Sequence, residues 1–272
     1  TLWHILSSMS NPELLAEWEQ ARVERDGYRA DVTITRPEKR NAMDESVIDD
    51  LCEAVRMADT TKRVRAIVLL GEGPVFCAGM DLEMMRDRKA EGATDERLPR
   101  LLETIESTQA PTVAAVKRAA PAGAFELTLP CDFRVLGDEA RYGIPEVKLG
   151  TFPHGGATQR LPRLVGLSRA KQIVLSGDWL EPMEAKAMGL VHEVVEDTHV
   201  DTRARALADE LCENAPLGMV NAKVALNAAL ETGLDEGLEL ERTLGRELDD
   251  THDYHEGFNA RIEDRKPEFE GR

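Results

Sequence analysis

Two short runs of apolar, β-favouring residues place the strongest limit on how this chain can fold. The segments VRAIVLLGEG (64–73) and PTVAAV (111–116) show almost no alternation of polar and apolar residues. Strands of this kind are buried on both faces, as in parallel sheets that are covered by helices. Between them, RLPRLLETIEST (97–108) has the spacing of an amphipathic helix. The order of strand, helix and strand therefore predicts an α/β architecture.

The remaining sequence extends this pattern and then changes it. A strand is predicted at 30–35, then a helix that Asp44 caps, and later short extended segments at 127–137 and 140–146. From about Thr158 onward helices are predicted at 158–176, 182–189, 200–214, 216–232, 234–249 and 252–265. We therefore expect an α/β core followed by a helical C-terminal part. The polar segment RKAEGATDERL (88–98) is the expected mobile loop.

The charge balance limits the partners of the protein. The formal net charge is −17, so its surface repels phosphates and nucleic acid is not an expected partner. Arginine outnumbers lysine 25 to 9. One hypothesis is a protein from a halophile, in which salt screens the self-repulsion of the acidic surface. The alternative is an acidic protein from a GC-rich genome, which also favours arginine over lysine.

Other features of the sequence bear on the compartment. No apolar run reaches the length that spans a bilayer, and the first residues lack the basic flank of a signal peptide, so no membrane association is expected. We take Met9 as the expected natural start. Scattered cysteines without a Cys-x-x-Cys pair argue against a metal site or a disulfide framework; they are Cys52, Cys77, Cys131 and Cys212. A reducing cytoplasm is the expected setting.

The loop GPVFCAGMDL (73–82) is the first candidate for chemistry. A strand ends at a glycine, and Asp81 follows at a point where a helix could open. The free backbone N–H groups at such a start can bind an anion or a developing oxyanion. Taken alone, an ordinary glycine turn is the simpler interpretation.

The second candidate is VKRAAPAGAFELTLPCDF (116–133), where Glu126 lies among small and apolar residues. Burial of a charged carboxylate in such surroundings is costly. If a helix begins near Gly123, its first amides and those near Gly79 and Met80 can together form an oxyanion hole. The alternative for Glu126 is an acid at the edge of the core that caps a helix terminus.

The third candidate is YGIPEVKLGTFPHGGATQRL (142–161), which carries a second carboxylate. Glu146 follows Pro145 and is therefore predicted on a turn. His154, in the same loop, carries little weight because a single loop histidine is usually only polar surface. Two acids in one apolar pocket can differ in pKa and divide the duties of acid and base, so Glu126 and Glu146 together indicate acid–base chemistry.

Other kinds of site find little support. No Walker A motif, dinucleotide fingerprint or G-x-S-x-G elbow occurs in the sequence. His252 and His255 are three residues apart on a predicted helix, but no third metal ligand is evident. Cys77 follows Phe76 in an apolar setting and is expected to be buried and inert.

Taken together, these segments resemble the enoyl-CoA hydratase/isomerase (crotonase) family, closest to its two-glutamate hydratases. The resemblance covers roughly residues 23–270 and rests on ITRPEKRNAMD, GEGPVFCAGMDL, AAPAGAFELTLPCDFRVLGDEARYGIPEVKLG, TFPHGGATQRLPRLVG, AKQIVLSGDWLEPMEAKAMGLVHEVV and HEGFNARIEDRKPEF. It implies a spiral of ββα units with a helical C-terminal region and assembly into a trimer or a dimer of trimers. The implied divisions are an N-terminal extension (1–22), the spiral core (23–198) and a helical trimerisation region (199–272).

The resemblance also assigns site residues. It implies that the amides of Met80 and Gly123 form the oxyanion hole and that Glu126 and Glu146 are the catalytic acids. It places coenzyme A contacts at Ala78, Asp81, Leu82, Lys39 and Lys266, with Lys266 serving a neighbouring subunit. Surface solvation is the alternative for both lysines.

The sequence departs from the family pattern at three positions. Arg118 stands where members carry a glycine, Pro121 lies in a run that is usually richer in glycine, and Arg261 stands where an aromatic residue is common over coenzyme A. These changes put the path of the 117–122 loop and the nucleotide contacts in doubt.

The function implied is that of an enoyl-CoA hydratase, which adds water reversibly across a trans-2-enoyl-CoA. We take Glu126 as the base and Glu146 as the acid, although the sequence alone does not assign the two roles, because the two carboxyls are expected to titrate as a coupled pair. No cofactor is expected, because acyl-CoA is the substrate. Two alternatives stay open. One is an isomerase or lyase that acts on a branched or aromatic acyl-CoA. The other is a non-catalytic homologue that binds coenzyme A. The sequence does not define the length of the acyl chain.

Overall fold

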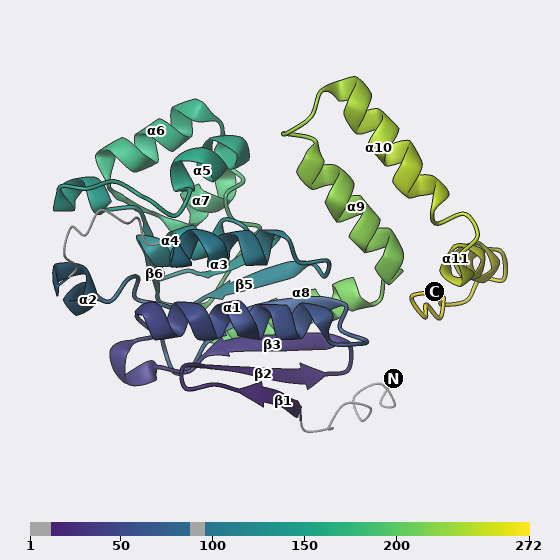
Figure 1. Ribbon diagram of the computed structural model, residues 1–272, viewed down its shortest axis with the longest axis horizontal. Coiled ribbons are helices and arrows are strands. Elements are labelled where there is room, and N and C mark those ends of the chain that lie inside the picture. The colour runs from purple at the N-terminus through teal and green to yellow at the C-terminus, as the bar shows by residue number, and fades with distance from the viewer. Residues whose placement is uncertain (1–11, 88–95) are drawn as a thin grey trace.

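The computed structural model of the protein describes residues 12–87 and 96–272. A seven-stranded sheet lies at its centre, with the strand order β1-β2-β3-β4-β5-β7-β10 (Figure 1). The strands are β1 (Glu13–Glu17), β2 (Ala21–Asp26), β3 (Arg29–Ile34), β4 (Ala66–Gly71), β5 (Thr112–Val116), β7 (Phe133–Gly137) and β10 (Glu193–Val195). β2 pairs antiparallel with both β1 and β3, and all pairs from β3 to β10 are parallel. Every residue of β4 and β5 is buried, which confirms the prediction of doubly covered strands. The predicted strand at 30–35 is β3, and it is buried throughout although its sequence alternates.

Helices cover both faces of this sheet (Figure 1). On one face lie α1 (Glu45–Thr60) and α3 (Arg97–Glu106). As predicted, Asp44 caps α1, since its carboxylate accepts the Val47 amide at 3.0 Å. On the other face α8 (Val200–Cys212) buries Val200, Ala204 and Ala208 against β4, β5 and β7.

A small second sheet sets up the candidate site. It consists of β6 (Ala119–Pro121), β8 (Arg141–Gly143) and β9 (Trp179–Leu180), in that order. β6 leads directly into α4 (Gly123–Thr128), and β8 leads into the 3-10 helix η3 (Glu146–Leu149). Because β6 and β8 pair in parallel, they deliver these two short helices to the same edge.

The remaining helices form the periphery. They are η2 (Pro37–Lys39), α2 (Leu82–Asp87), α5 (Ala157–Val165), α6 (Leu167–Ser176), α7 (Pro182–Ala187), η4 (Asp197–His199), α9 (Pro216–Ala228), α10 (Leu234–Arg246) and α11 (His252–Ile262). α9 and α10 form an antiparallel arm beside the body, and α11 lies beyond it (Figure 1). The arm is anchored by the buried Lys223, whose Nζ lies 2.7 Å from Asp132 Oδ2. No helix in the described ranges is long and apolar enough to cross a membrane.

Several predicted elements need correction. Residues 127 and 128 are helical rather than extended, because Leu127 and Thr128 complete α4 before β7 begins at Phe133. The single helix predicted at 158–176 is two helices, since Gly166 adopts φ +82° and ψ 155°, which no helix accommodates. The segment expected as an N-terminal extension contributes β1 and part of β2 to the main sheet. Met9 and residues 88–95 of the expected mobile loop lie outside the described residues.

Candidate active site

The loop before α2 directs one backbone amide, that of Met80, away from the neighbouring segment around Met43. Met43 donates to the Gly79 carbonyl at 2.8 Å, and its own carbonyl accepts the Asp81 amide at 2.8 Å. These two bonds form a parallel bridge between Met43 and Met80. The Met80 N–H belongs to the same trans peptide group as the Gly79 carbonyl, which faces Met43, so this N–H points to the opposite side, away from Met43.

The second amide belongs to Gly123, the first residue of α4. The first hydrogen bond of this helix runs from the Glu126 amide to the Ala122 carbonyl, so the Gly123 amide has no partner within the helix. A Cβ atom at Gly123 would lie 3.0 Å from Met80 Cγ, and one at Gly79 would lie 3.0 Å from the Pro121 carbonyl oxygen. The two loops are therefore packed against each other, as an oxyanion hole built from both would require.

Glu126 is held at the edge of this arrangement and is only 2% exposed. Its Oε1 accepts the Ala157 amide at 3.0 Å, and the Gly155 amide also stabilises the carboxylate. Burial raises the pKa of Glu126 above its usual range, while the two amides and the nearby Arg160 cation oppose that shift. Glu126 is thus a buried acid whose charged form has several donors.

Glu146 is a buried acid of a different kind. It is the first residue of η3, directly after Pro145, and is 9% exposed. Within the described part of the chain its buried Oε2 has no hydrogen-bond partner. Burial, together with the neighbouring charge of Glu126, raises the pKa of Glu146 to about 7. A carboxyl group in this state can hold a proton near neutral pH and has one oxygen free to meet a ligand.

The two environments separate the acids chemically. Because the charge of Glu126 acts on Glu146, the pair titrates as a coupled system. The amides and the cation favour the ionised form at Glu126, whereas the unpartnered oxygen of Glu146 favours its neutral form. One shared proton between a base and an acid, beside two free backbone amides, can support addition or removal of a proton next to a carbonyl group.

The residues predicted to contact coenzyme A lie in two separate places. Ala78, Asp81 and Leu82 adjoin Met80, and Lys39 reaches the same region through an ion pair with Glu83 at 3.3 Å. Asp81 is 8% exposed and caps α2 through bonds to the Glu83 and Met84 amides. Leu82 is 75% exposed, and the Ala78 amide donates to the Arg40 carbonyl.

Lys266 lies far from this group in the same chain. It follows α11 at the opposite side of the molecule from α2 (Figure 1), and its Nζ pairs with Glu213 at 2.7 Å. One copy of the chain does not bring Lys266 to the carboxylate pair, so its predicted role requires a second copy.

Two of the departures from the family pattern, Arg118 and Pro121, lie in the loop that leads into α4. Arg118 adopts φ +58°, in the left-handed region that favours glycine, while its exposed side chain pairs with Glu139. Ala122 has φ +53° and ψ −123°, a conformation that is also costly for a residue with a Cβ. Pro121 ends β6 opposite Gly143. The backbone of this loop therefore enters the positive-φ region twice, with Arg118 and Ala122 rather than glycine at those positions.

Sequence reasoning missed the turn that holds Glu126. Gly155 and Ala157 were not predicted to touch this acid, and Arg160 was not singled out. A Cβ at Gly155 would lie only 2.9 Å from Glu126 Oε2, so the position requires glycine. The two adjacent glycines before a helix were a visible signal, but nothing in the sequence shows which side chain they approach.

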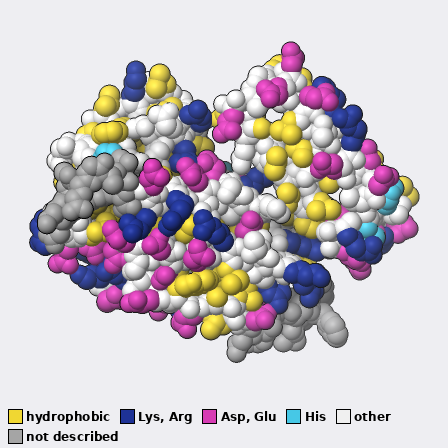
Figure 2. All heavy atoms as spheres, in the orientation of Figure 1, with side chains coloured by type: hydrophobic (Ala, Val, Ile, Leu, Met, Phe, Trp, Pro, Cys, Tyr) yellow, Lys and Arg dark blue, Asp and Glu magenta, His cyan; other side chains and the backbone are white. Residues whose placement is uncertain are grey.

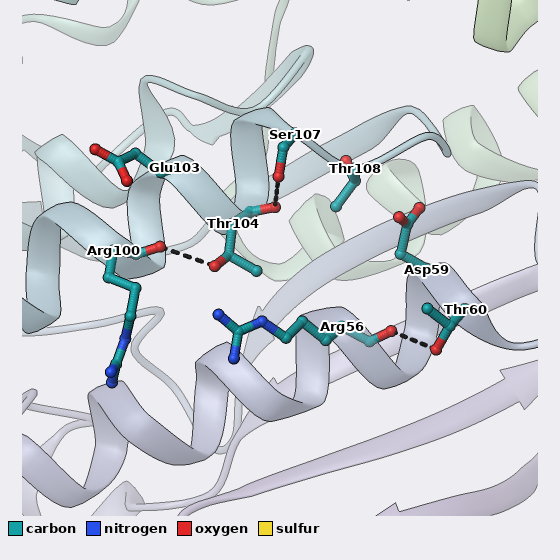
Figure 3. A pocket seen from close by; sticks show the side chains of 8 residues that line it. All are labelled: Arg56, Asp59, Thr60, Arg100, Glu103, Thr104, Ser107 and Thr108. Carbon is teal, nitrogen blue, oxygen red and sulfur yellow. Dashed lines mark hydrogen bonds between the residues drawn. The ribbon is translucent and has the colours of Figure 1, made fainter.

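A separate hollow of about 330 Å³ lies between α1 and α3 (Figure 3). Its polar side chains bond mainly to nearby backbone; Thr104 Oγ1, for example, donates to the Arg100 carbonyl at 2.8 Å. None of its lining residues belongs to the predicted site. Across residues 12–87 and 96–272, no cluster of three His, Cys, Asp or Glu side chains could hold a metal ion.

Comparison with known proteins shows to which family the chain belongs. A sequence model described as "Enoyl-CoA hydratase/isomerase" matches residues 27–272. The chain belongs to the enoyl-CoA hydratase/isomerase family. A crystal structure of an enoyl-CoA hydratase subunit from Geobacillus kaustophilus superimposes with a TM-score of 0.88 at 32% identity, covering 94% of this chain and all of the other. The predicted crotonase fold is therefore confirmed.

Named relatives in this family include several hydratases. A probable mitochondrial enoyl-CoA hydratase of Dictyostelium discoideum is 36% identical over 90% of this chain and 88% of its own length. The 2,3-dehydroadipyl-CoA hydratase of Escherichia coli is 36% identical over 89% of this chain and 94% of its own. The mouse mitochondrial methylglutaconyl-CoA hydratase is 36% identical over 88% and 78%, respectively.

Proposed function

We propose that this protein is an enoyl-CoA hydratase, which adds water reversibly across the 2,3 double bond of a trans-2-enoyl-CoA thioester. The observation that carries this assignment is the coupled pair of buried acids, Glu126 and Glu146, beside the free amides of Met80 and Gly123. The hydratase names of several relatives support the same reaction.

In the proposed mechanism one acid of the pair accepts a proton and the other donates one. Ionised Glu126 takes a proton from water as the water oxygen bonds to C3 of the substrate. The electron pair of the double bond moves toward the thioester oxygen, which would accept bonds from the Met80 and Gly123 amides. Protonated Glu146 then delivers its proton to C2. A proton passing from Glu126 to Glu146 restores the starting state, so protein groups and water are sufficient and no further cofactor enters.

The amides contribute because the charge that they meet is larger in the transition state than in the substrate. Such interactions lower the barrier rather than merely tighten binding. Removal of one oxyanion-hole donor costs about 10²–10³ in rate in known enzymes. The unpartnered Glu146 Oε2 and the buried but hydrogen-bonded Glu126 carboxylate fit opposite protonation states, as the division of labour requires.

The experiment that tests this function is turnover of crotonyl-CoA by the wild type, Glu126→Gln and Glu146→Gln. We expect hydration by the wild type and a loss of at least about 10²-fold in kcat for each variant. Near-full activity of either variant would refute the two-acid mechanism. Double-bond migration without hydration would favour the isomerase or lyase alternative, and binding of coenzyme A without any turnover would favour a non-catalytic homologue.

We also propose that the nucleotide end of the substrate binds near Lys39, Ala78, Asp81 and Leu82. Lys39 is exposed and its partner Glu83 is exposed as well, so this ion pair can open at little cost for an incoming phosphate. The net charge of −17 makes such local cations necessary for an anionic ligand.

The proposed assembly is a homotrimer or a dimer of trimers formed through residues 199–272. Apolar side chains gather on the surface of the α9–α10 arm (Figure 2), where Leu226, Leu230 and Leu234 are 72%, 62% and 78% exposed. A second copy covering this arm would bury them and could bring its Lys266 to the first site. Light scattering after size exclusion measures the number of copies; a monomer would contradict this assembly. The buried, unpaired cysteines are compatible with the proposed cytoplasmic setting.

A further inference from the structure

The carboxylate of Glu126 owes its position to a turn on another part of the chain. This turn, residues 155–157, precedes α5 and supplies the Ala157 amide to Oε1 at 3.0 Å. It also brings Gly155 so close that a Cβ there would lie 2.9 Å from Oε2. Any displacement of the turn therefore displaces the carboxylate or leaves it without donors.

Arg160, one turn into α5, fixes this segment from behind. Its Nη1 donates to the carbonyl of Gly155 at 3.1 Å, and Gly155 belongs to the turn that contacts Glu126. The same nitrogen would lie 2.3 Å from a Cβ at Gly156, which has φ +106°. The guanidinium thus occupies the space that a side chain at Gly156 would need, and it packs directly under the turn.

The other side of the guanidinium is held by Glu106, the last residue of α3. Nε and Nη2 of Arg160 bind the two carboxylate oxygens at 3.1 and 2.7 Å, which is a bidentate ion pair. The Arg160 side chain is 18% exposed and that of Glu106 is 46% exposed. Three fixed contacts therefore hold one planar cation between α3 and the turn.

We propose that Arg160 is a positioning residue for Glu126: it holds the 155–157 turn against the carboxylate and places a positive charge near it, without touching the reacting atoms. This role rests on the proposed function, in which Glu126 acts as the base. Lysine could not replace it fully, because an ammonium group lacks the planar fork that binds Glu106 and the Gly155 carbonyl together.

The charges around Glu126 predict opposite effects on its ionisation when Arg160 or Glu106 is removed. The facing charged groups are Arg160 from α5, Glu106 behind it from α3, and Glu146 from η3. Loss of the Arg160 cation leaves the Glu106 anion uncompensated, which favours protonation of Glu126. Loss of the Glu106 charge instead leaves the cation uncompensated, which favours ionisation of Glu126. A simple structural tie between α3 and α5 would respond in the same way to either loss.

The test compares Arg160→Met, Arg160→Lys and Glu106→Gln with the wild type in the full-length protein. The first readout is the pH profile of kcat/KM for crotonyl-CoA. We expect the acidic limb to move to higher pH in Arg160→Met and to lower pH in Glu106→Gln, each by about one unit or less. Arg160→Lys should keep the limb near the wild-type position, while kcat falls roughly tenfold because the turn loses its fork.

The second readout does not depend on the reaction. The ¹³C resonance of the Glu126 carboxyl, assigned by its loss in Glu126→Gln, reports the ionisation of this group in each variant. Two results would overturn the role of Arg160. In one, the acidic limb and the titration of the Glu126 resonance stay at their wild-type pH in both Arg160→Met and Glu106→Gln. In the other, they shift in the same direction in both variants. A wild type without hydratase activity but with opposite ¹³C shifts would refute the proposed function and leave the positioning of Glu126 intact. If Arg160→Met does not fold, the shift in Glu106→Gln and the kcat of Arg160→Lys decide the question.

Discussion

Substitution of Gly155 by alanine tests most directly how tightly the candidate base is held. The new Cβ would lie 2.9 Å from Glu126 Oε2 and 3.0 Å from its Cδ, whereas ordinary contact begins near 3.4 Å. Leu102 Cδ1 would also lie only 3.0 Å from this Cβ, so the methyl group would be crowded by a second side chain. The carboxylate must therefore shift by about half an ångström.

The expected magnitude follows from that shift. A misplacement of about 1 Å at a reacting group can cost about 10²-fold in rate, so half that distance should cost roughly tenfold in kcat, or about 1.4 kcal/mol. Overpacking of this kind also destabilises a protein by about 1–3 kcal/mol. The assay is the loss of the conjugated thioester absorbance of crotonyl-CoA, with thermal unfolding measured in parallel.

The matched control is Gly245→Ala. This glycine lies within α10, and a Cβ there would meet nothing within 4 Å. We expect unchanged kcat and slightly higher stability, because alanine favours the helix. A folded Gly155→Ala variant with full kcat would refute the reasoning, since it would show that Glu126 tolerates displacement or is not the base.

Three further predictions concern titration, strain and salt. Because the pKa of Glu146 is raised to about 7 from an ordinary value of 4.5, the unfolded state releases this proton first. The contribution of Glu146 to the free energy of unfolding therefore falls as pH rises from about 4.5 to 7 and is smallest above pH 7. Denaturant unfolding across that range measures the dependence of stability on pH, and this dependence should be weaker in Glu146→Gln. Ala122→Gly should raise stability by about 1 kcal/mol by relieving the positive φ, seen as a Tm higher by about 2 °C. Finally, the net charge of −17 predicts a Tm that rises from dilute buffer to molar KCl.

Opposite results would be informative in each case. An unchanged pH slope in Glu146→Gln would place the raised pKa elsewhere. A lower Tm for Ala122→Gly would mean that the Ala122 methyl group packs well enough to outweigh its backbone strain. A Tm that is flat or falls with KCl would remove the halophilic hypothesis and favour the GC-rich alternative.

The fold could be predicted where local pattern and burial agree. Residues 64–73 and 111–116 are apolar without alternation, and they form the buried strands β4 and β5. β1 and β2 escaped prediction because their Glu and Arg side chains face one another across the antiparallel pair, as in the ion pair of Arg25 with Glu13, and this hides the apolar face. The sequence LTL after Glu126 favours a strand, but it completes the helix that begins at Gly123.

The same division applies to the site. Glu126, Glu146, Met80 and Gly123 could be predicted as site residues because an apolar setting, a glycine and the resemblance to a family agreed on them. The contacts that set the state of Glu126 could not, since they join residues 31 positions apart in sequence through a backbone amide. Every residue except proline carries a backbone amide, so the sequence does not show which amides act as donors to Glu126. Likewise, nothing in the sequence distinguishes Arg160 from the other arginines, of which the chain has 25 in all.

The bridge between Met43 and Met80 has a consequence for how this site can be studied. It fixes the peptide group of Met80 through bonds made by its neighbours, so the proposed donor remains whatever side chain occupies position 80. Alanine at position 80 would therefore leave the donor in place and would not report its contribution. Only a change to the backbone itself, such as replacing the Met80 amide by an ester, would remove the donor and show its share of the rate.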